Sequence, residues 1–154
     1  MAIEKENTKA LLALQMAGIS KTSQRLAVLD ILFKSGKPLS ANTIRRLLKA
    51  KASIDKVTVY RILALFKKSG MVREIASAGG MNYFEMLSKE NPAHPHFNCR
   101  NCGELTCMET QIAVKMPELI SSKGNYSIEH IEINVSGLCS DCRNMIKPEL
   151  SKHD

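Results

Sequence analysis

Hydrophobic residues recur at helical spacing along the first half of the chain, in segments bounded by glycine or hydroxyl-bearing residues. This pattern predicts helices over residues 8–17, 22–36, 40–50 and 55–70. The last has the clearest apolar face, with large apolar side chains at positions i, i+3, i+4 and i+7. These residues are Val59, Ile62, Leu63 and Phe66. The preceding helix has three residues expected to face the core, Ile44, Leu47 and Leu48.

Two extended segments, Val72–Ala76 and Asn82–Met86, follow the last of these helices. The small residues Ala78-Gly79-Gly80 between them favour a tight turn, so the two segments are predicted to form a hairpin. Short helices followed by a hairpin are typical of a winged helix-turn-helix domain, whose recognition helix enters the major groove of DNA.

The second half of the chain has a different pattern. Short strands are predicted at His96–Cys99 and Leu105–Met108, and a longer one at Tyr126–Val135, which is rich in Ile and Val. Residues 109–123 and 140–147 are expected to be helical. The predicted fold class is therefore α+β, with an N-terminal winged helix-turn-helix domain followed by a small α+β domain.

The distribution of charge divides the chain where the pattern changes. Residues 1–88 contain 15 Lys and Arg against 6 Asp and Glu, whereas residues 89–154 contain 7 against 9. All five cysteines and all four histidines lie in the second part. We therefore place a domain boundary near residue 88. The basic first domain favours a polyanionic partner because neutralising phosphates releases counterions, and a basic surface that serves only solubility is the alternative.

No stretch of the chain is apolar enough for a membrane span, which needs about 18–20 residues. The N-terminus contains acidic residues and lacks the apolar segment of a signal peptide. These features predict a cytoplasmic protein without a membrane partner. The sequence also contains no catalytic triad context, phosphate loop or evident carboxylate pair, so no enzyme activity is expected.

Two Cys-x-x-Cys pairs are the most specific feature of the sequence, Cys99 with Cys102 and Cys139 with Cys142. Four thiolates in two such pairs can surround one Zn²⁺ tetrahedrally. The pairs are far apart in the chain, so this structural zinc would join the start of the domain to its end. A redox-active pair is the alternative, although the strand–helix–strand context of thioredoxin-like proteins is lacking.

A second candidate metal site consists of Glu85, His94, His96 and Cys107. The two histidines are two positions apart, so on a strand both rings face the same side, and Cys107 lies on the neighbouring predicted strand. Imidazole, thiolate and carboxylate groups together suit a divalent metal, zinc especially. Solvated histidines with Cys107 as core filling are the alternative.

Four residues are candidates for contact with DNA. Tyr60 and Arg61 lie outside the apolar face of the helix over residues 55–70. Arginine can pair with guanine or phosphate, and an aromatic ring can pack on thymine methyl groups. Lys21 and Arg25 stand at the start of an earlier helix, where phosphate contacts are expected. A solvated cationic face is the alternative.

Between Gly18 and Asn144 the chain resembles the ferric uptake regulator (Fur) superfamily of metal-dependent repressors. The resemblance rests on four motifs in order: Thr22-Ser23-Gln24-Arg25, Thr58-Val59-Tyr60-Arg61, His94-x-His96-x-x-Cys99-x-x-Cys102-Gly103 and Gly137-Leu138-Cys139-x-x-Cys142. It implies a homodimer with a winged-helix DNA-binding domain (1–88) and an α+β dimerisation domain (89–154). It also implies zinc at the paired cysteines and a regulatory metal at Glu85, His94 and His96. Such proteins bind palindromic operator DNA when metal-loaded and block transcription of metal-uptake or stress genes.

Among the departures from the family pattern that bear on the sensed metal, Cys107 matters most. Iron- and peroxide-sensing members usually carry a carboxylate at that position, and a thiolate is a softer ligand that favours zinc. We therefore expect a repressor similar to the zinc uptake regulators, with Zn²⁺ preferred over Fe²⁺ or Mn²⁺ at the regulatory site. The alternatives are an iron-, manganese- or peroxide-sensing member of the superfamily, a thiol-based redox sensor that binds DNA, and a constitutive binding module.

Overall fold

The computed structural model describes residues 2–49, 54–77, 79–88, 91–108, 124–127 and 131–146. The chain divides into two compact units. The first comprises Met1–Ala76 and Met81–Pro92, and the second comprises Ser77–Gly80 and Ala93–Asp154. Among the described helices, none has the length and apolar character that crossing a membrane would require.

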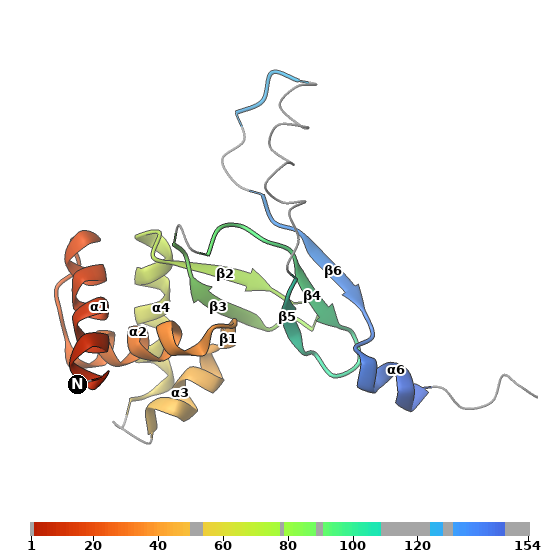
Figure 1. The fold of residues 1–154 in the computed structure, drawn as a ribbon, viewed down its shortest axis with the longest axis horizontal. Helices are drawn as coiled ribbons and strands as arrows, with labels where there is room; N and C mark the ends of the chain where they lie inside the picture. The colour runs from red at the N-terminus through yellow and green to blue at the C-terminus, as the bar shows by residue number, and fades with distance from the viewer. Residues whose placement is uncertain are drawn as a thin grey trace, which may run out of the picture. The chain divides into compact units, whose positions relative to one another are not determined.

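The first unit combines helices with a small antiparallel sheet (Figure 1). Its described elements are α1 (Ala2–Met16), α2 (Ser23–Ser35), β1 (Leu39–Ser40), α3 (Ala41–Lys49), α4 (Lys56–Lys68), β2 (Val72–Ala76) and β3 (Asn82–Met86). Strand β3 lies between β1 and β2 and is antiparallel to both. The predicted winged helix-turn-helix pattern is confirmed. The two-residue strand β1, which the sequence did not predict, adds a third strand to the hairpin.

Side-chain caps fix the ends of the helices as expected. At the start of α2 the Thr22 hydroxyl accepts the backbone N–H of Arg25 at 3.2 Å, and Gly36 ends the helix at a φ of 59°, where glycine is favoured. At the start of α4 the Asp55 carboxylate accepts the Thr58 hydroxyl at 2.5 Å and the Thr58 backbone N–H at 3.0 Å. These two bonds, that of the hydroxyl first, hold the pKa of Asp55 below its usual value.

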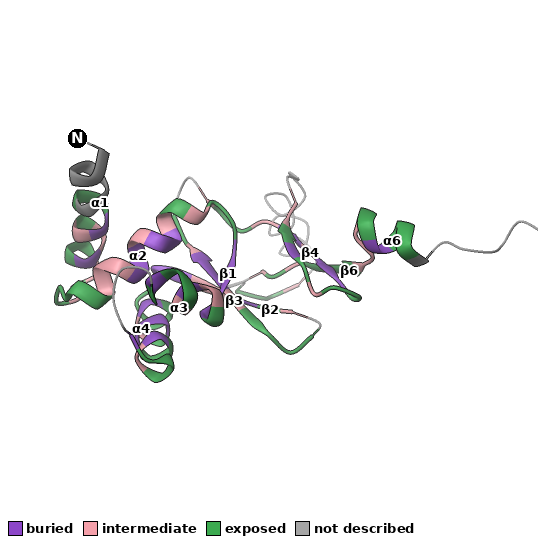
Figure 2. Cartoon of the chain, turned by 90° about the horizontal axis from the view of Figure 1, so that it is seen from below, coloured by how far each residue is buried: buried purple, intermediate pink, exposed green. Residues whose placement is uncertain are grey.

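The predicted apolar face of α4 forms the centre of the core of the first unit, and Figure 2 shows α4 with buried and exposed sides. All four predicted residues are buried. In α3 the prediction is confirmed for Ile44 and Leu48, but it is wrong for Leu47, which is 45% exposed. The buried face of α3 passes through Ala41, Ile44 and Leu48, and at 3.6 residues per turn Leu47 lies about a quarter turn away from it.

The neighbouring leucines of α3 provide a matched test of this packing. Leu48→Ala is expected to lower the free energy of unfolding by about 2–5 kcal/mol, because it leaves a cavity in the core. Leu47→Ala should cost less than about 1 kcal/mol, because the side chain is already exposed to water. Urea unfolding of both variants measures the difference. Similar losses in the two variants would contradict the described face of α3.

The second unit contains the strands β4 (His96–Cys99), β5 (Leu105–Cys107) and β6 (Asn134–Gly137) and the helix α6 (Ser140–Ile146). Strand β4 lies between the others, antiparallel to β5 and parallel to β6. The predicted strand Tyr126–Val135 is wrong in position. The described residues 126–127 and 131–133 are outside any strand, because pairing with β4 selects Asn134–Gly137, which overlaps only the last two residues of the predicted strand. The helix predicted over residues 109–123 lies outside the described residues.

Candidate functional site

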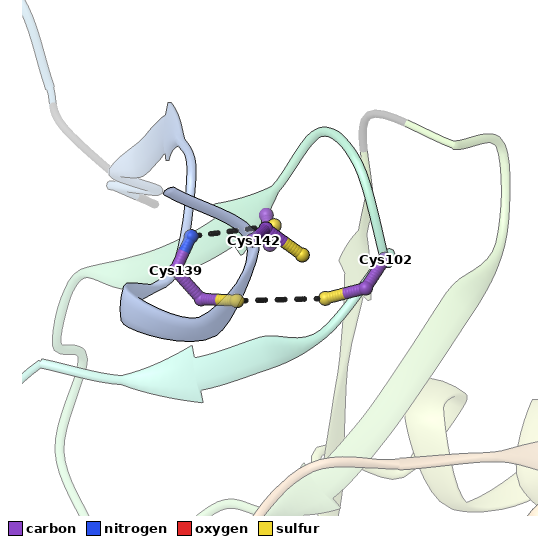
Figure 3. A group of neighbouring side chains, drawn as sticks. Cys102, Cys139 and Cys142 are labelled. Carbon is purple, nitrogen blue, oxygen red and sulfur yellow. Dashed lines mark hydrogen bonds between the residues drawn. The ribbon is translucent and has the colours of Figure 1, made fainter. Parts of the chain in front are cut away.

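The four paired cysteines come together within the second unit. Figure 3 shows three of them, Cys102, Cys139 and Cys142. The parallel register of β4 and β6 sets Cys99 beside Gly137, so the two cysteine pairs occupy the same end of the two strands. Their four Sγ atoms lie within 4.8 Å of one another, and those of Cys102 and Cys139 are 3.8 Å apart. A tetrahedral zinc with Zn–S distances of about 2.3 Å needs sulfur atoms about 3.8 Å apart. The cluster therefore suits structural zinc.

Hydrogen bonds and neighbouring thiols give the cysteines of this cluster different pKa values. The backbone N–H of Cys102 and then that of Cys139, whose nitrogen is 3.3 Å from the Cys99 sulfur, lower the pKa of Cys99 to about 6. The backbone N–H of Glu104 lowers the pKa of Cys102, but the Cys99 thiol, burial and the other two thiols outweigh it and raise the value to about 12. Four thiols this close need a cation among them before all can ionise, which is the state that binds zinc.

A second cluster of metal-ligand types lies where β4 begins. The strand register places His96 opposite Cys107, and the Met108 N–H donates to the Pro95 carbonyl at 2.9 Å. The rings of His94 and His96 have centroids 4.5 Å apart. The ligand atoms of these two histidines and Cys107 lie within 4.8 Å of one another. Three residues of the second predicted site are thus brought together, with His96 buried and the other two half-buried.

The remaining residue of that predicted site, Glu85, lies on β3 in the first unit. Its side chain is 5% exposed and stands opposite Arg73 of β2 in the strand register. The Arg73 Nε donates to the Glu85 Oε1 at 2.5 Å. Glu85 therefore carries its charge in a buried ion pair. This pairing was not predicted, although a hairpin centred on residue 79 makes the two residues direct cross-strand neighbours.

The donor atoms of the second cluster fit zinc. Two imidazole nitrogens and one thiolate are ligands that zinc prefers, whereas Fe²⁺ and Mn²⁺ sites are richer in oxygen donors. Zinc commonly takes four ligands, so the three residues from the second unit leave one position for a further donor.

Two of the four predicted DNA-contact residues line one shallow cleft between α2 and α4. Arg25 and Arg61 border this cleft of about 240 Å³ together with Thr22, Gln24 and Thr58. The guanidinium of Arg25 also donates to the carbonyl and hydroxyl of Ser20, both at 2.6 Å. Two cationic side chains among hydroxyl groups at the starts of two helices form a surface that suits phosphate.

The other two predicted contact residues lie outside the lining of that cleft. Lys21 is exposed just before α2, and Tyr60 is 43% exposed on α4. The ammonium group of Lys56 lies 5.7 Å from the centre of the Tyr60 ring, within the range of a cation–π contact. Tyr60 therefore presents an aromatic surface beside a positive charge.

Helix α3 carries a basic surface that the sequence interpretation missed. Arg45, Arg46 and Lys49 line a groove of about 330 Å³ together with Asn42 and Thr43. The spacing of the three basic residues at i, i+1 and i+4 places them on one side of a helix. That spacing is visible in the sequence, where the basic residues lie among the apolar positions that predict the buried face of the same helix.

A family model and two known proteins match most of the length of this chain. The model of the ferric uptake regulator family matches residues 16–136. The ferric uptake regulation protein of Legionella pneumophila is 30% identical over 132 residues, which are 84% of this chain and 96% of that protein. The peroxide operon regulator of Bacillus subtilis (strain 168) is 27% identical over 138 residues, 89% of this chain and 93% of that protein.

The fold comparison agrees with the sequence comparison. The crystal structure of the Vibrio cholerae ferric uptake regulator aligns with a TM-score of 0.70 at 28% identity, covering 83% of this chain and 98% of that one. The region matched by the family model spans α2, α3 and α4 of the first unit, both histidines of the second cluster and the first cysteine pair. On these grounds, the chain belongs to the ferric uptake regulator family.

Proposed function

We propose that this protein is a metal-dependent repressor of metal-homeostasis genes that binds operator DNA as a homodimer. Residues 1–88 form its DNA-binding domain, and residues 89–154 form its dimerisation and metal-binding domain. The observation that carries the proposal is the convergence of His94, His96 and Cys107, a set of metal donors, in a chain that also has a winged helix. As a transcription regulator, the protein needs no catalytic group.

The four-cysteine cluster holds structural zinc in this proposal. Its members come from the end of β4 and the turn after it, and from the start of α6. These two segments are 37 residues apart at Cys102 and Cys139. Zinc binding therefore closes a long loop and couples metal occupancy to the folding of the second unit. This site is occupied permanently and does not act as the sensor.

The second cluster is the regulatory site, and Glu85 supplies its remaining ligand. His94, His96 and Cys107 belong to the second unit, whereas Glu85 belongs to the first. A metal held by all four residues would favour one arrangement of the two units over others. In a homodimer, that preference sets the spacing of the two winged helices and so the affinity for a two-part operator.

Zinc is the preferred regulatory metal because Cys107 contributes a thiolate. Iron, manganese or peroxide sensing is a second candidate, and it is favoured by the similarity to relatives named for ferric uptake and for a peroxide operon. The two candidates differ in the role of Cys107. Zinc sensing makes it a ligand, and the other candidate leaves it as a packing or redox residue.

Arg61→Ala is expected to weaken operator binding about 10–100-fold, because arginine contacts with a base or phosphate contribute about 1–3 kcal/mol. The metal content should be unchanged, because Arg61 lies on α4 and belongs to neither cluster. Lys37→Ala is the matched control, since it removes an exposed positive charge in the turn between α2 and β1. A parallel loss of metal in Arg61→Ala would refute the separation of roles.

The operator itself can be found by selection from a pool of random duplexes. The protein is incubated with the pool either at buffered free zinc or with a chelator that leaves the structural zinc in place. The proposal expects a palindromic sequence to be enriched with zinc and not with the chelator. Enrichment of the same sequence under both conditions would show a constitutive DNA-binding module instead.

A further inference from the structure

Arg73 contacts both the proposed ligand Glu85 and the segment in which the first unit ends. Besides its bond to the Glu85 carboxylate, its terminal nitrogen Nη2 donates to the carbonyl groups of Asn91 at 2.9 Å and Pro92 at 2.8 Å. Pro92 is the last residue of the first unit. One guanidinium thus links a carboxylate in the hairpin to the end of this unit.

The end segment is itself folded back on β3. The Asn91 backbone N–H donates to the Ser88 carbonyl at 3.1 Å, and the Asn91 side-chain amide donates to the Met86 carbonyl at 2.8 Å. The same amide nitrogen lies 3.4 Å from the second carboxylate oxygen of Glu85. The segment, the carboxylate and Arg73 therefore form one connected set of hydrogen bonds inside the first unit.

Both members of the ion pair at the centre of this set, Arg73 and Glu85, are largely shielded from water. The Arg73 side chain is 11% exposed and the Glu85 side chain is 5% exposed. A buried carboxylate that loses its cation is strongly destabilised unless another cation replaces it. A divalent metal is such a replacement. A nearby guanidinium also repels that metal, so the presence of either cation beside the carboxylate weakens the binding of the other.

We propose that Arg73 is a positioning residue that competes with the regulatory metal for Glu85, so that metal binding changes the hydrogen bonds of the guanidinium that also contacts Asn91 and Pro92. This inference rests on the proposed role of Glu85 as a ligand. Without metal, the guanidinium holds the carboxylate and the two carbonyl groups together. When Glu85 turns to the metal, the Arg73 Nε loses its acceptor, whereas the bonds of Arg73 to the carbonyl groups of Asn91 and Pro92 do not involve the carboxylate. Arg73 thereby raises the metal concentration needed to activate the protein.

The first test compares zinc affinities of the regulatory site in the full-length protein with its structural zinc in place. Competition with a chelator of known affinity, at slightly alkaline pH, gives the dissociation constant. Arg73→Gln should bind zinc about tenfold more tightly, the factor expected when one competing charge-assisted hydrogen bond is lost. Lys67→Gln removes a cation that pairs with Glu74 in the same unit, and it should leave the affinity unchanged. Unchanged or weaker binding in folded Arg73→Gln would overturn the inference.

Glu85→Gln separates failure of this inference from failure of the ligand assignment. If Glu85 is a ligand, this variant binds zinc more weakly than wild type. Weaker binding in Glu85→Gln without tighter binding in Arg73→Gln would refute the role of Arg73 alone. Unchanged binding in Glu85→Gln would remove Glu85 from the regulatory site, and the role of Arg73 with it.

The second test uses the wild-type chain, so it does not depend on a variant that folds. While the regulatory site holds no metal, the Arg73 Nε–H proton should give a downfield NMR resonance with slow solvent exchange. The reason is that this group is largely shielded from water and bonded to a carboxylate. One equivalent of zinc should move this resonance and speed its exchange. A resonance that is unaffected when zinc fills the regulatory site would show that Glu85 keeps its partner, and it would refute the competition.

Discussion

Cys102→Ser is expected to remove zinc from the four-cysteine cluster and to unfold the second unit. Structural zinc sites of four ligands contribute about 10–16 kcal/mol of apparent binding free energy, so losing one thiolate should weaken binding by more than a hundredfold, or about 3 kcal/mol. The described sheet of this unit has only short strands, and its strand β6 joins the rest beside the cysteine pairs. Elemental analysis, thermal unfolding and the size of the particle in solution measure the losses of zinc, of folded structure and of the dimer.

Cys107→Ser is the matched control, because it also replaces a cysteine by serine but lies in the other cluster. This variant should keep its structural zinc, its fold and its dimer, and lose affinity at the regulatory site alone. A Cys102→Ser protein that stays folded, dimeric and fully zinc-loaded would count against the assignment of four thiolate ligands.

His96→Ala is expected to abolish the effect of metal on operator binding while structural zinc is retained. The coupling between an effector and a second ligand is typically about 1–3 kcal/mol, so metal should raise the operator affinity of wild type about 5–150-fold and that of the variant by much less. The reason is geometric, since His96 is the most buried residue of its cluster and stands opposite Cys107 in the strand register. Operator titrations at fixed free zinc, with and without the substitution, give both factors.

Linkage provides an internal check on that result. Operator DNA must raise the affinity of wild type for the regulatory metal by the same factor by which the metal raises its affinity for DNA. His153→Ala, which alters a histidine that neither proposed site uses, should preserve the full effect. If His96→Ala responds to metal like wild type, the second cluster is not the regulatory site.

Local features of the sequence were sufficient to predict most of the first unit. The apolar face of α4 is buried at all four predicted positions, and Thr22, Ser40 and Asp55 each cap the helix they precede. These features depend on side chains within one turn of a helix, so a single segment contains the information. The exposed Leu47 shows the limit, because composition alone does not fix where the edge of a buried face falls.

Contacts between segments that are distant in the sequence were harder to predict. The weakly alternating segment that ends at Val135 is rich in Ile and Val, yet β6 begins only at Asn134, where the backbone pairs with His96. That register depends on a partner almost 40 residues away, and β propensity depends strongly on such context. The ligand clusters were predictable because cysteine and histidine are the common ligands of zinc, so their residue types and spacing alone indicate a metal site. The Arg73–Glu85 pair was missed because charged residues are common at surfaces and burial decides their role.

The central claim, that metal at the second cluster controls DNA binding, is tested most directly by fluorescence anisotropy of a labelled operator. The protein carries only its structural zinc at the start, and buffered free zinc is then added, with manganese in a parallel titration. The account predicts weak binding without added metal and an increase in affinity of about 5–150-fold as zinc fills the regulatory site, with a smaller effect of manganese at equal occupancy. The same affinity with and without metal would contradict it.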